Sequence, residues 1–398
     1  MRSSRIARRW GMLAVLSLGQ LFGMASWFAA SAVSPELVEL WSLGSQQVGW
    51  LTTSVQLGFV TGTAVAAVLN LADIVPARWY FAGSAFLAAG VNAGLLIAPG
   101  FESGLVLRFL TGAALAGVYP PAMKMTATWF RSARGLAIGV VVGALTAGKA
   151  APYLIKVIGG ARFEPVVVAT SGAAVLAALL VLLLYRDGPH RFDRRPFQWS
   201  LVGTVLRHRE TRLAIGGYCG HMLELYAVWA WIPVFLAARA GDGGAAVDLA
   251  SFGAIATGAL GCVLGGAIAD RIGRARWAVL AMGASGLACL GAGLAFAAPW
   301  VVVVAFTWVW GFFVVADSAQ FSAIVTEVAP SHAVGTALTL QTSLGFGLTA
   351  ITLQAVPWAA DLVGWQWAFG FLAAGPMLGI LFMRPLVGGH RHQTPVAP

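Results

Sequence analysis

The sequence predicts an all-α integral membrane protein of about twelve transmembrane helices. Only 10% of its 398 residues are charged and 59% are hydrophobic, and the mean hydropathy is +0.81. A soluble domain needs roughly 25% charged residues to hydrate its surface, so most of this surface must face lipid. Apolar runs of about 18 residues or more recur along the whole chain, which excludes a single anchor attached to a soluble domain.

Each half of the chain contains six such runs. The first six are 11–33, 48–69, 79–98, 104–128, 135–157 and 165–185; the second six are 213–237, 250–269, 277–298, 300–325, 334–355 and 365–383. The polar segment 186–212 separates them, so we expect a six-helix bundle in residues 1–185, a cytoplasmic linker, and a second bundle with a short tail in 213–398. The basic start resembles a secretory signal, but its apolar run exceeds the usual core of about 7–15 residues. We therefore expect an uncleaved first helix.

The basic residues are placed on one side of the predicted membrane. The net charge of +10 and pI of 10.3 could indicate nucleic-acid binding. Nearly all arginines, however, fall in the termini and in alternate connections. The other connections keep only Lys156, Arg162 and Arg239 beside a larger number of acids, Glu36, Glu39, Glu102, Glu164, Asp242, Asp248 and Asp361. This is the positive-inside bias. It predicts a multi-pass protein of the plasma (inner) membrane with both termini cytoplasmic, a lipid environment and no nucleic-acid partner.

The two halves carry matching segments. Leu71-Ala72-Asp73 followed by Ala77-Arg78-Trp79 recurs about half a chain later as Ile268-Ala269-Asp270 followed by Ala275-Arg276-Trp277. A second pair, starting at Arg134 and at Val334, has a similar offset. Two parallel repeats of six helices place a solute site near the midplane, where the repeats meet.

These features resemble the major facilitator superfamily. The segment from Gly266 to Arg276 matches that family's loop motif G-x-x-x-D-R-x-G-R-x-[KR] at every fixed position, and Arg108-Phe-Leu-Thr-Gly112 is similar to its R-x-x-x-G motif. The resemblance spans essentially the whole chain. It implies two six-helix bundles related by a pseudo-twofold axis along the membrane normal, and secondary transport of a small solute.

The resemblance also implies a conformational latch at the loop motifs. In the second half the latch residues would be Gly266, Asp270, Arg271, Gly273 and Arg274, with Asp270 placed to meet a helix N-terminus or an arginine. The first-half copy keeps Asp73 and Arg78, but Leu69 and Pro76 replace its glycines.

Charges inside the predicted helices indicate a wet cavity. A charge at the bilayer centre costs about 2.5–3.5 kcal/mol on insertion scales, so it usually faces a cavity or a partner. Arg108, Lys124, Lys149, Glu224 and Asp317 all lie in helices 4, 5, 7 and 10. In the resembled family, helices 1, 4, 7 and 10 line the cavity and helices 2, 5, 8 and 11 flank it, which fits this placement.

The candidate solute-binding residues are Lys149, Lys124, Arg108, Tyr119 and Gln320. The only lysines are Lys124, Lys149 and Lys156, all in helices 4 and 5. An ammonium is a compact charge suited to small anions. Alternatives stay open: Lys124 and Lys156 can snorkel to the membrane surface, and Arg108 can serve structure or gating. Pro120 and Pro121 should bend helix 4 beside Tyr119.

The acids of the second half are candidates for proton coupling. His221 and Glu224 are three residues apart and share a helical face, as do Asp317 and Gln320. A buried carboxylate can bind and release a proton as two halves rock. We therefore assign Glu224, Asp317 and His221 to coupling, against the alternative of a static bridge between halves.

The expected function is alternating-access transport of a small organic or inorganic anion, coupled to protons. The embedded residues include three cations and two acids, so one cation is left over if the acids pair with cations. A drug–proton antiporter is the alternative, although helix 5 reads Gly148-Lys149-Ala-Ala-Pro152 instead of that group's Gly-Pro pair. Nitrate or nitrite porters usually have an arginine in helices 2 and 8, which is missing here.

A third alternative is a membrane protein that does not transport a solute. The sequence shows no nucleophile elbow, no phosphate-binding glycine loop and no spacing of Cys219, Cys262 and Cys289 typical of a metal site. We therefore expect no enzyme activity, no cofactor and no metal, and a monomer whose partners are its solute, the proton and lipid.

Overall fold

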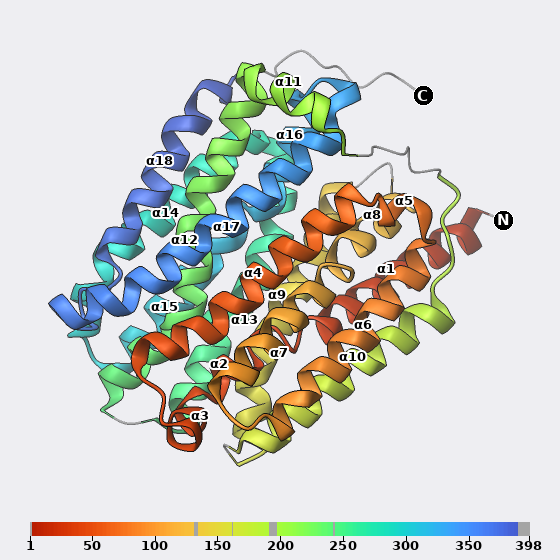
Figure 1. Ribbon diagram of the computed structural model, residues 1–398. Coiled ribbons are helices and arrows are strands. Elements are labelled where there is room, and N and C mark those ends of the chain that lie inside the picture. The colour runs from red at the N-terminus through yellow and green to blue at the C-terminus, as the bar shows by residue number, and fades with distance from the viewer. Residues whose placement is uncertain (1, 131–133, 161, 191–196, 242, 389–398) are drawn as a thin grey trace.

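The computed structural model describes residues 2–130, 134–160, 162–190, 197–241 and 243–388, and within these ranges it is helical without any strand. Most helices run roughly parallel along one long direction (Figure 1). The helices of the first half lie on one side of the molecule and those of the second half on the other. We call the end with α11 (Val202–Arg207), where α1 begins, the linker end, and the opposite end the α3 end.

The first half of the chain forms helices that alternate in direction. Their bounds are α1 Arg2–Gly23, α2 Ala29–Ala32, α3 Ser34–Trp41, α4 Ser45–Val68, α5 Leu71–Ile74, α6 Ala77–Ala93, α7 Phe101–Leu115, α8 Tyr119–Ala127, α9 Arg134–Ile158 and α10 Phe163–Leu184, with a 3-10 turn at Gly94–Ile97.

The second half repeats this pattern after the linker. Its helices are α12 Arg209–Ala240, α13 Ala245–Ile272, α14 Arg274–Phe296, α15 Trp300–Ala316, α16 Ser318–Val328, α17 Val334–Val363 and α18 Ala374–Met383, with 3-10 turns at Trp199–Leu201, Ser331–Ala333, Gly370–Ala373 and Arg384–Leu386. The predicted linker is therefore partly helical, and the seventh long helix begins at Arg209 rather than at 213.

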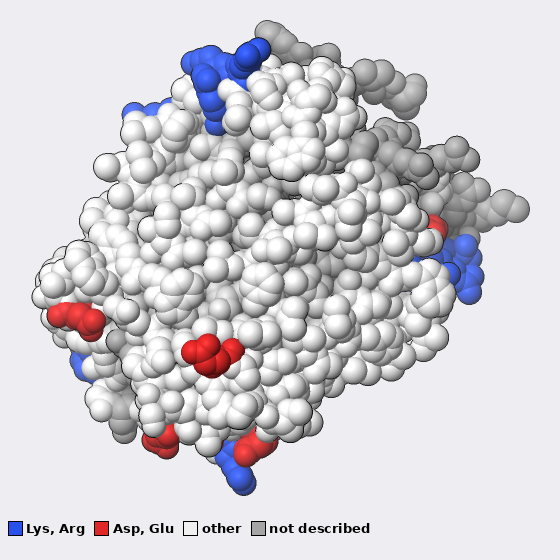
Figure 2. Space-filling view, viewed as in Figure 1, with Lys and Arg blue, Asp and Glu red and all other residues white. Residues whose placement is uncertain are grey.

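Within the described ranges, ten helical segments are long and apolar enough to cross a membrane. The segments predicted as helices 1 and 12 are not among them: α1 carries several arginines, and the last apolar helix, Gly370–Leu386, is short. On the face shown in Figure 2, basic side chains lie mainly near the linker end and acidic ones mainly near the α3 end, with an uncharged surface between. An uncharged belt between two charged ends is what a bilayer requires.

Three predicted helices are interrupted near mid-length. The first ends at Gly23 and resumes only at Ala29, the fourth breaks between Leu115 and Tyr119, and the tenth breaks at Asp317. The prediction that Pro120 and Pro121 bend helix 4 is confirmed, because α8 starts immediately before them. The prediction of one continuous helix over 11–33 was wrong. Hydropathy does not reveal such a break, because the backbone groups that it frees form hydrogen bonds with other helices.

Two helix pairs join the two halves of the chain. Helix α9 packs along α13, and α4 packs along α17. Toward the α3 end the joint carries polar contacts: Gln354 Nε2 donates to Thr53 Oγ1 at 2.9 Å, and Lys156 Nζ lies 2.9 Å from Asp248 Oδ1. Lys156, which we expected could snorkel, thus forms an ion pair between α9 and α13.

Candidate functional site

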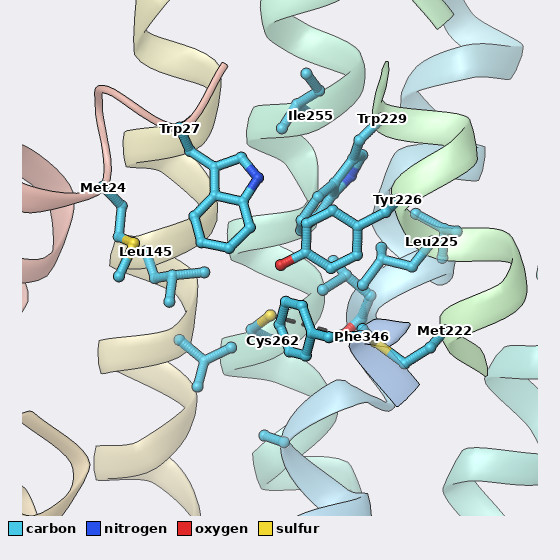
Figure 3. Packing of buried hydrophobic residues seen from close by; sticks show 14 of the residues in the cluster. Met24, Trp27, Leu145, Met222, Leu225, Tyr226, Trp229, Ile255, Cys262 and Phe346 are labelled. Atoms are coloured by element: carbon cyan, nitrogen blue, oxygen red, sulfur yellow. Dashed lines mark hydrogen bonds between the residues drawn. The ribbon is translucent and has the colours of Figure 1, made fainter. Parts of the chain in front are cut away.

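A pocket lies where the two halves meet. Its wall combines residues from α4, α9, α12 and α17 with those of the broken first, fourth and tenth helices. Figure 3 shows its core, where Trp27 faces Tyr226 and Trp229 of α12 across the joint, with Leu145 and Phe346 beside them. The free volume at its centre is about 40 Å³. That is room for only a few water molecules, so the structure shows the pocket nearly closed.

Lys149 is the centre of this pocket. Its side chain is 2% exposed, and its ammonium donates a hydrogen bond to the hydroxyl of Tyr226. The Nζ atom also lies 3.9 Å from the ring centre of Trp27, 4.5 Å from that of Tyr226 and 5.3 Å from that of Trp229. Among the described residues no carboxylate is within ion-pair distance of this ammonium. The ring faces partly compensate the cation but do not neutralise it.

Arg108 holds the break of the first helix. Its guanidinium is fully buried, donates to the carbonyl oxygen of Ser26 at 3.0 Å and of Trp27, and reaches Asn92 Oδ1 at 3.2 Å. Where the first helix is interrupted, its carbonyls need donors. Arg108 therefore fixes the segment that presents Trp27 to Lys149, and it does not line the pocket.

His221 and Asp317 form a buried pair beside the pocket. The Nδ1 atom of His221 lies 3.0 Å from Asp317 Oδ1, and both side chains are 1% exposed. The sequence suggested instead that His221 would face Glu224. Asp317 stands at the break between α15 and α16, so the pair ties that break to α12. Their neighbours Tyr218, Met222 and Ser318 line the pocket itself.

Glu224 points into the second half, away from the pocket wall. Its carboxylate accepts hydrogen bonds from Ser285, from Cys289 Sγ at 3.0 Å and from Trp310 Nε1 at 3.1 Å. The structure pairs neither Glu224 nor Asp317 with Arg108 or Lys149, so the pairing that the charge count took as its condition does not occur among these four residues. The number of charges in the sequence does not reveal that neutral hydrogen-bond donors, and not cations, contact the Glu224 carboxylate.

The loop motif of the second half makes a connected network at the linker end. Arg274 Nη2 lies 3.3 Å from Asp270, its Nε 2.8 Å from Glu327, and its Nη1 donates to Gln320 Oε1 at 2.9 Å. Gln320 therefore contacts the motif rather than the pocket.

The same motif touches the first half. A methyl group placed on Gly135, at the start of α9, would lie 2.6 Å from Asp270 Oδ2, so the carboxylate sits against that helix N-terminus, where its charge is favoured. Gly266 lies close to the Gly135 carbonyl, while Gly273 has a φ of 98°, which favours glycine at the α13–α14 turn. Arg271 is exposed.

The remaining predicted residues lie as follows. Tyr119 lines the pocket, and Lys124 is partly exposed in the last turn of α8, outside the pocket wall. Arg78 stacks its guanidinium 5.6 Å from the ring centre of Trp79. The side chain of Asp73 lies outside the described residues. The roles proposed for all these residues stay predictions.

The sequence reading missed the aromatic residues around Lys149. The sequence alone did not lead us to choose Trp27, Tyr226 or Trp229 as site residues. The available signal was the spacing of Tyr226 and Trp229, three residues apart in the helix that also carries His221 and Glu224. No comparable signal marked Trp27, because its position depends on the break held by Arg108.

The pocket combines one basic side chain with aromatic and aliphatic neighbours. In the described part of the chain, no group of three histidine, cysteine or acidic residues is placed to hold a metal ion. Lys149 is a buried basic side chain without a carboxylate partner among the described residues, and it lies at a joint between two sets of helices. A basic group in such a place can bind a small anion.

Comparisons with known proteins also indicate transport across a membrane. The family model of the Major Facilitator Superfamily matches residues 16–353. The hexuronate transporter of Escherichia coli (strain K12) is 24% identical over 412 residues, covering 94% of this chain and 92% of that protein. The galacturonate transporter of Dickeya chrysanthemi is 23% identical, covering 65% of this chain and 80% of that protein. A probable sulfoacetate transporter of Cupriavidus necator is 25% identical, covering 71% and 73%.

Proposed function

This chain belongs to the Major Facilitator Superfamily, and we propose that it moves an organic anion across the plasma (inner) membrane by alternating access. Its helices then form two bundles of six, residues 1–185 and 213–398, joined by the linker 186–212 and related by a pseudo-twofold axis. In this arrangement α1 and the last helix, Gly370–Leu386, complete the set of twelve spans, and the linker end is cytoplasmic. The chain acts as a monomer.

One observation carries the proposal that the solute is an anion. Lys149 is buried in the pocket at the joint between halves, and the described residues give it no carboxylate partner. Burying an uncompensated charge is unfavourable, so a solute carboxylate would gain an unusually strong contact there. Relatives named for hexuronate, galacturonate and sulfoacetate, all anions, support this class. The same cation disfavours the lipophilic cations of a drug antiporter.

The aromatic contacts that close the pocket support the proposal of alternating access. Trp27 packs on Tyr226 with ring centres 5.7 Å apart, and Phe28 packs on Trp229 at 6.4 Å. Both contacts join the first half to the second on the side of the pocket toward the α3 end. A solute can enter the nearly closed pocket only if these helices separate, which a rocking motion of the two bundles would achieve.

We propose that the coupling proton is carried by the His221–Asp317 pair. This pair adjoins the pocket and ties α12 to the break in the tenth helix, so a change in its charge would alter the geometry of the pocket wall. Apart from the 3.0 Å approach of His221 Nδ1 to Asp317 Oδ1, the described residues give the two Asp317 oxygens no hydrogen-bond donor, and they give His221 Nε2 no partner. Glu224 is the second candidate, but three donors from its own half already hold its carboxylate.

Exchange of labelled anion in proteoliposomes tests the anion proposal. We expect Lys149→Gln to reduce exchange of the transported anion by at least about tenfold, since a charge-assisted hydrogen bond contributes about 1.5–3 kcal/mol. Arg162→Gln is the matched control, because Arg162 is 72% exposed at the α3 end. Equal exchange by wild type and Lys149→Gln would refute the assignment, and uptake of lipophilic cations would favour the drug antiporter.

A pH gradient across the same liposomes tests the coupling proposal. We expect Asp317→Asn and His221→Asn to keep anion exchange but lose accumulation driven by the gradient, because exchange needs no net proton movement. Glu224→Gln should retain gradient-driven accumulation. The reverse pattern would move the coupling proton to Glu224.

A further inference from the structure

The pocket wall restricts the kind of anion that fits. We infer that the solute is a monocarboxylate with a flat, largely apolar body, such as an aromatic acid, rather than a polyhydroxylated sugar acid or a dianion. This inference rests on the proposed function, because it takes Lys149 as the partner of the solute's carboxylate.

The charge of the wall supports a single negative charge on the solute. Lys149 is the one charged side chain among the described residues that line the pocket. The other embedded cations are engaged or elsewhere: Arg108 binds the carbonyls of the first helix, and Lys156 pairs with Asp248. A dianion would bring one charge into this apolar space without a counter-charge, which is strongly unfavourable.

The geometry around the ammonium supports a carboxylate. Three ring faces surround Lys149 Nζ, and its one side-chain hydrogen bond goes to Tyr226. A planar carboxylate oxygen can replace that hydroxyl as the acceptor while the rings stay in place. The described wall contains no arginine, whose paired donors would suit the larger sulfonate or phosphate groups.

Most of the remaining wall is made of aromatic and aliphatic side chains. Phe59 and Phe346 meet at 4.6 Å between ring centres, Trp27 lies 5.1 Å from Phe59, and Tyr226 lies 5.2 Å from Phe346. Such ring clusters favour another flat ring in offset or edge-to-face contact. Residues such as Leu145 and Met222 complete this apolar surface.

Among its described residues the wall offers hydroxyl and indole groups to a sugar ring, but no carboxylate and no side-chain amide. The hydroxyl of Thr146 already donates to the Val142 carbonyl at 2.9 Å, and the other hydroxyls of the described wall belong to Tyr119, Tyr218, Tyr226 and Ser318. The indole N–H groups of Trp27 and Trp229 have no hydrogen-bond partner among the described residues and add two donors. Each sugar hydroxyl that loses water without a new partner weakens binding, so a hexuronate would bind poorly here.

Binding to the purified full-length protein, followed by tryptophan fluorescence, tests this inference. The probes are phenylacetate, its neutral amide phenylacetamide, glucuronate and sulfoacetate. We expect phenylacetate to bind at least about tenfold more tightly than the other three. Phe346→Ala should weaken phenylacetate binding by at least about tenfold, whereas Phe86→Ala, which changes a 40%-exposed ring on α6, should leave it unchanged.

The outcomes separate this inference from the proposed function. Tighter binding of glucuronate or sulfoacetate than of phenylacetate, lost in Lys149→Gln, would overturn the inference about the solute body and leave the anion function intact. Equal binding of phenylacetate and phenylacetamide would overturn both. Loss of phenylacetate binding in Phe346→Ala, with glucuronate unbound by wild type, would support the inference.

Discussion

At the scale of single residues, Lys149 is surrounded by side chains that lie far from it in the sequence. The confinement of all lysines to two predicted helices singled it out in the sequence. Its contacts come from Trp27 and from Tyr226, which is 77 residues away in sequence. No local pattern encodes such neighbours, because they depend on how α1 and α12 pack. The same reason explains why His221 was assigned to Glu224, its helical neighbour, and not to Asp317.

Arg108 provides a prediction about stability. In Arg108→Gln the carbonyls of Ser26 and Trp27 would lose charged donors, at a cost of about 1–3 kcal/mol for each buried group left unsatisfied. We expect a clear fall in the melting temperature of the detergent-solubilised protein, together with weaker anion binding because Trp27 is no longer fixed. Arg162→Gln should leave the melting temperature unchanged. An unaltered melting temperature in Arg108→Gln would contradict the structural role.

At the scale of elements, the apolar runs placed most helices within a few residues. The order of the helices followed from hydropathy. Hydropathy did not predict the three breaks in the helices. Only the break beside Pro120 and Pro121 had a signal in the sequence. The break that exposes Trp27 and the break at Asp317 are satisfied by tertiary contacts, such as those from Arg108, which periodicity along one helix cannot reveal.

The contact between α9 and α13 depends on glycine. A methyl group on Gly139 would lie 2.7 Å from the carbonyl oxygen of Cys262, whereas one on Gly83 of α6 would meet nothing within 4 Å. We therefore expect Gly139→Ala to lower the melting temperature and anion exchange. Gly83→Ala should raise stability slightly, since alanine favours a helix over glycine by up to about 1 kcal/mol. If both variants behave alike in a thermal unfolding assay, close packing at this joint is wrong.

At the scale of the whole molecule, the ion pair at the α3 end should favour the closed pocket. Lys156 and Asp248 join α9 to α13 at 2.9 Å, with side chains 12% and 6% exposed. We expect Asp248→Asn to shift the molecule toward a state open at that end. The measurement is the rate at which a membrane-impermeant thiol reagent labels a cysteine introduced at Gln354.

The reversed pair provides the control for this prediction. Lys156→Asp combined with Asp248→Lys restores opposite charges and should return the labelling rate toward that of the wild type. Faster labelling in Asp248→Asn that the double variant does not correct would show that the effect is not the ion pair.

The central claim is that the positive charge at position 149 holds the transported anion, and chemical restoration of that charge tests it directly. Lys149→Cys should lose anion exchange in proteoliposomes. Treatment with aminoethyl methanethiosulfonate, which attaches an ammonium to the new cysteine, should restore a substantial part of it, whereas methyl methanethiosulfonate, which attaches a neutral group, should not. Wild type treated with both reagents controls for Cys219, Cys262 and Cys289. Undiminished exchange by Lys149→Cys, or equal recovery with the neutral reagent, would contradict the account.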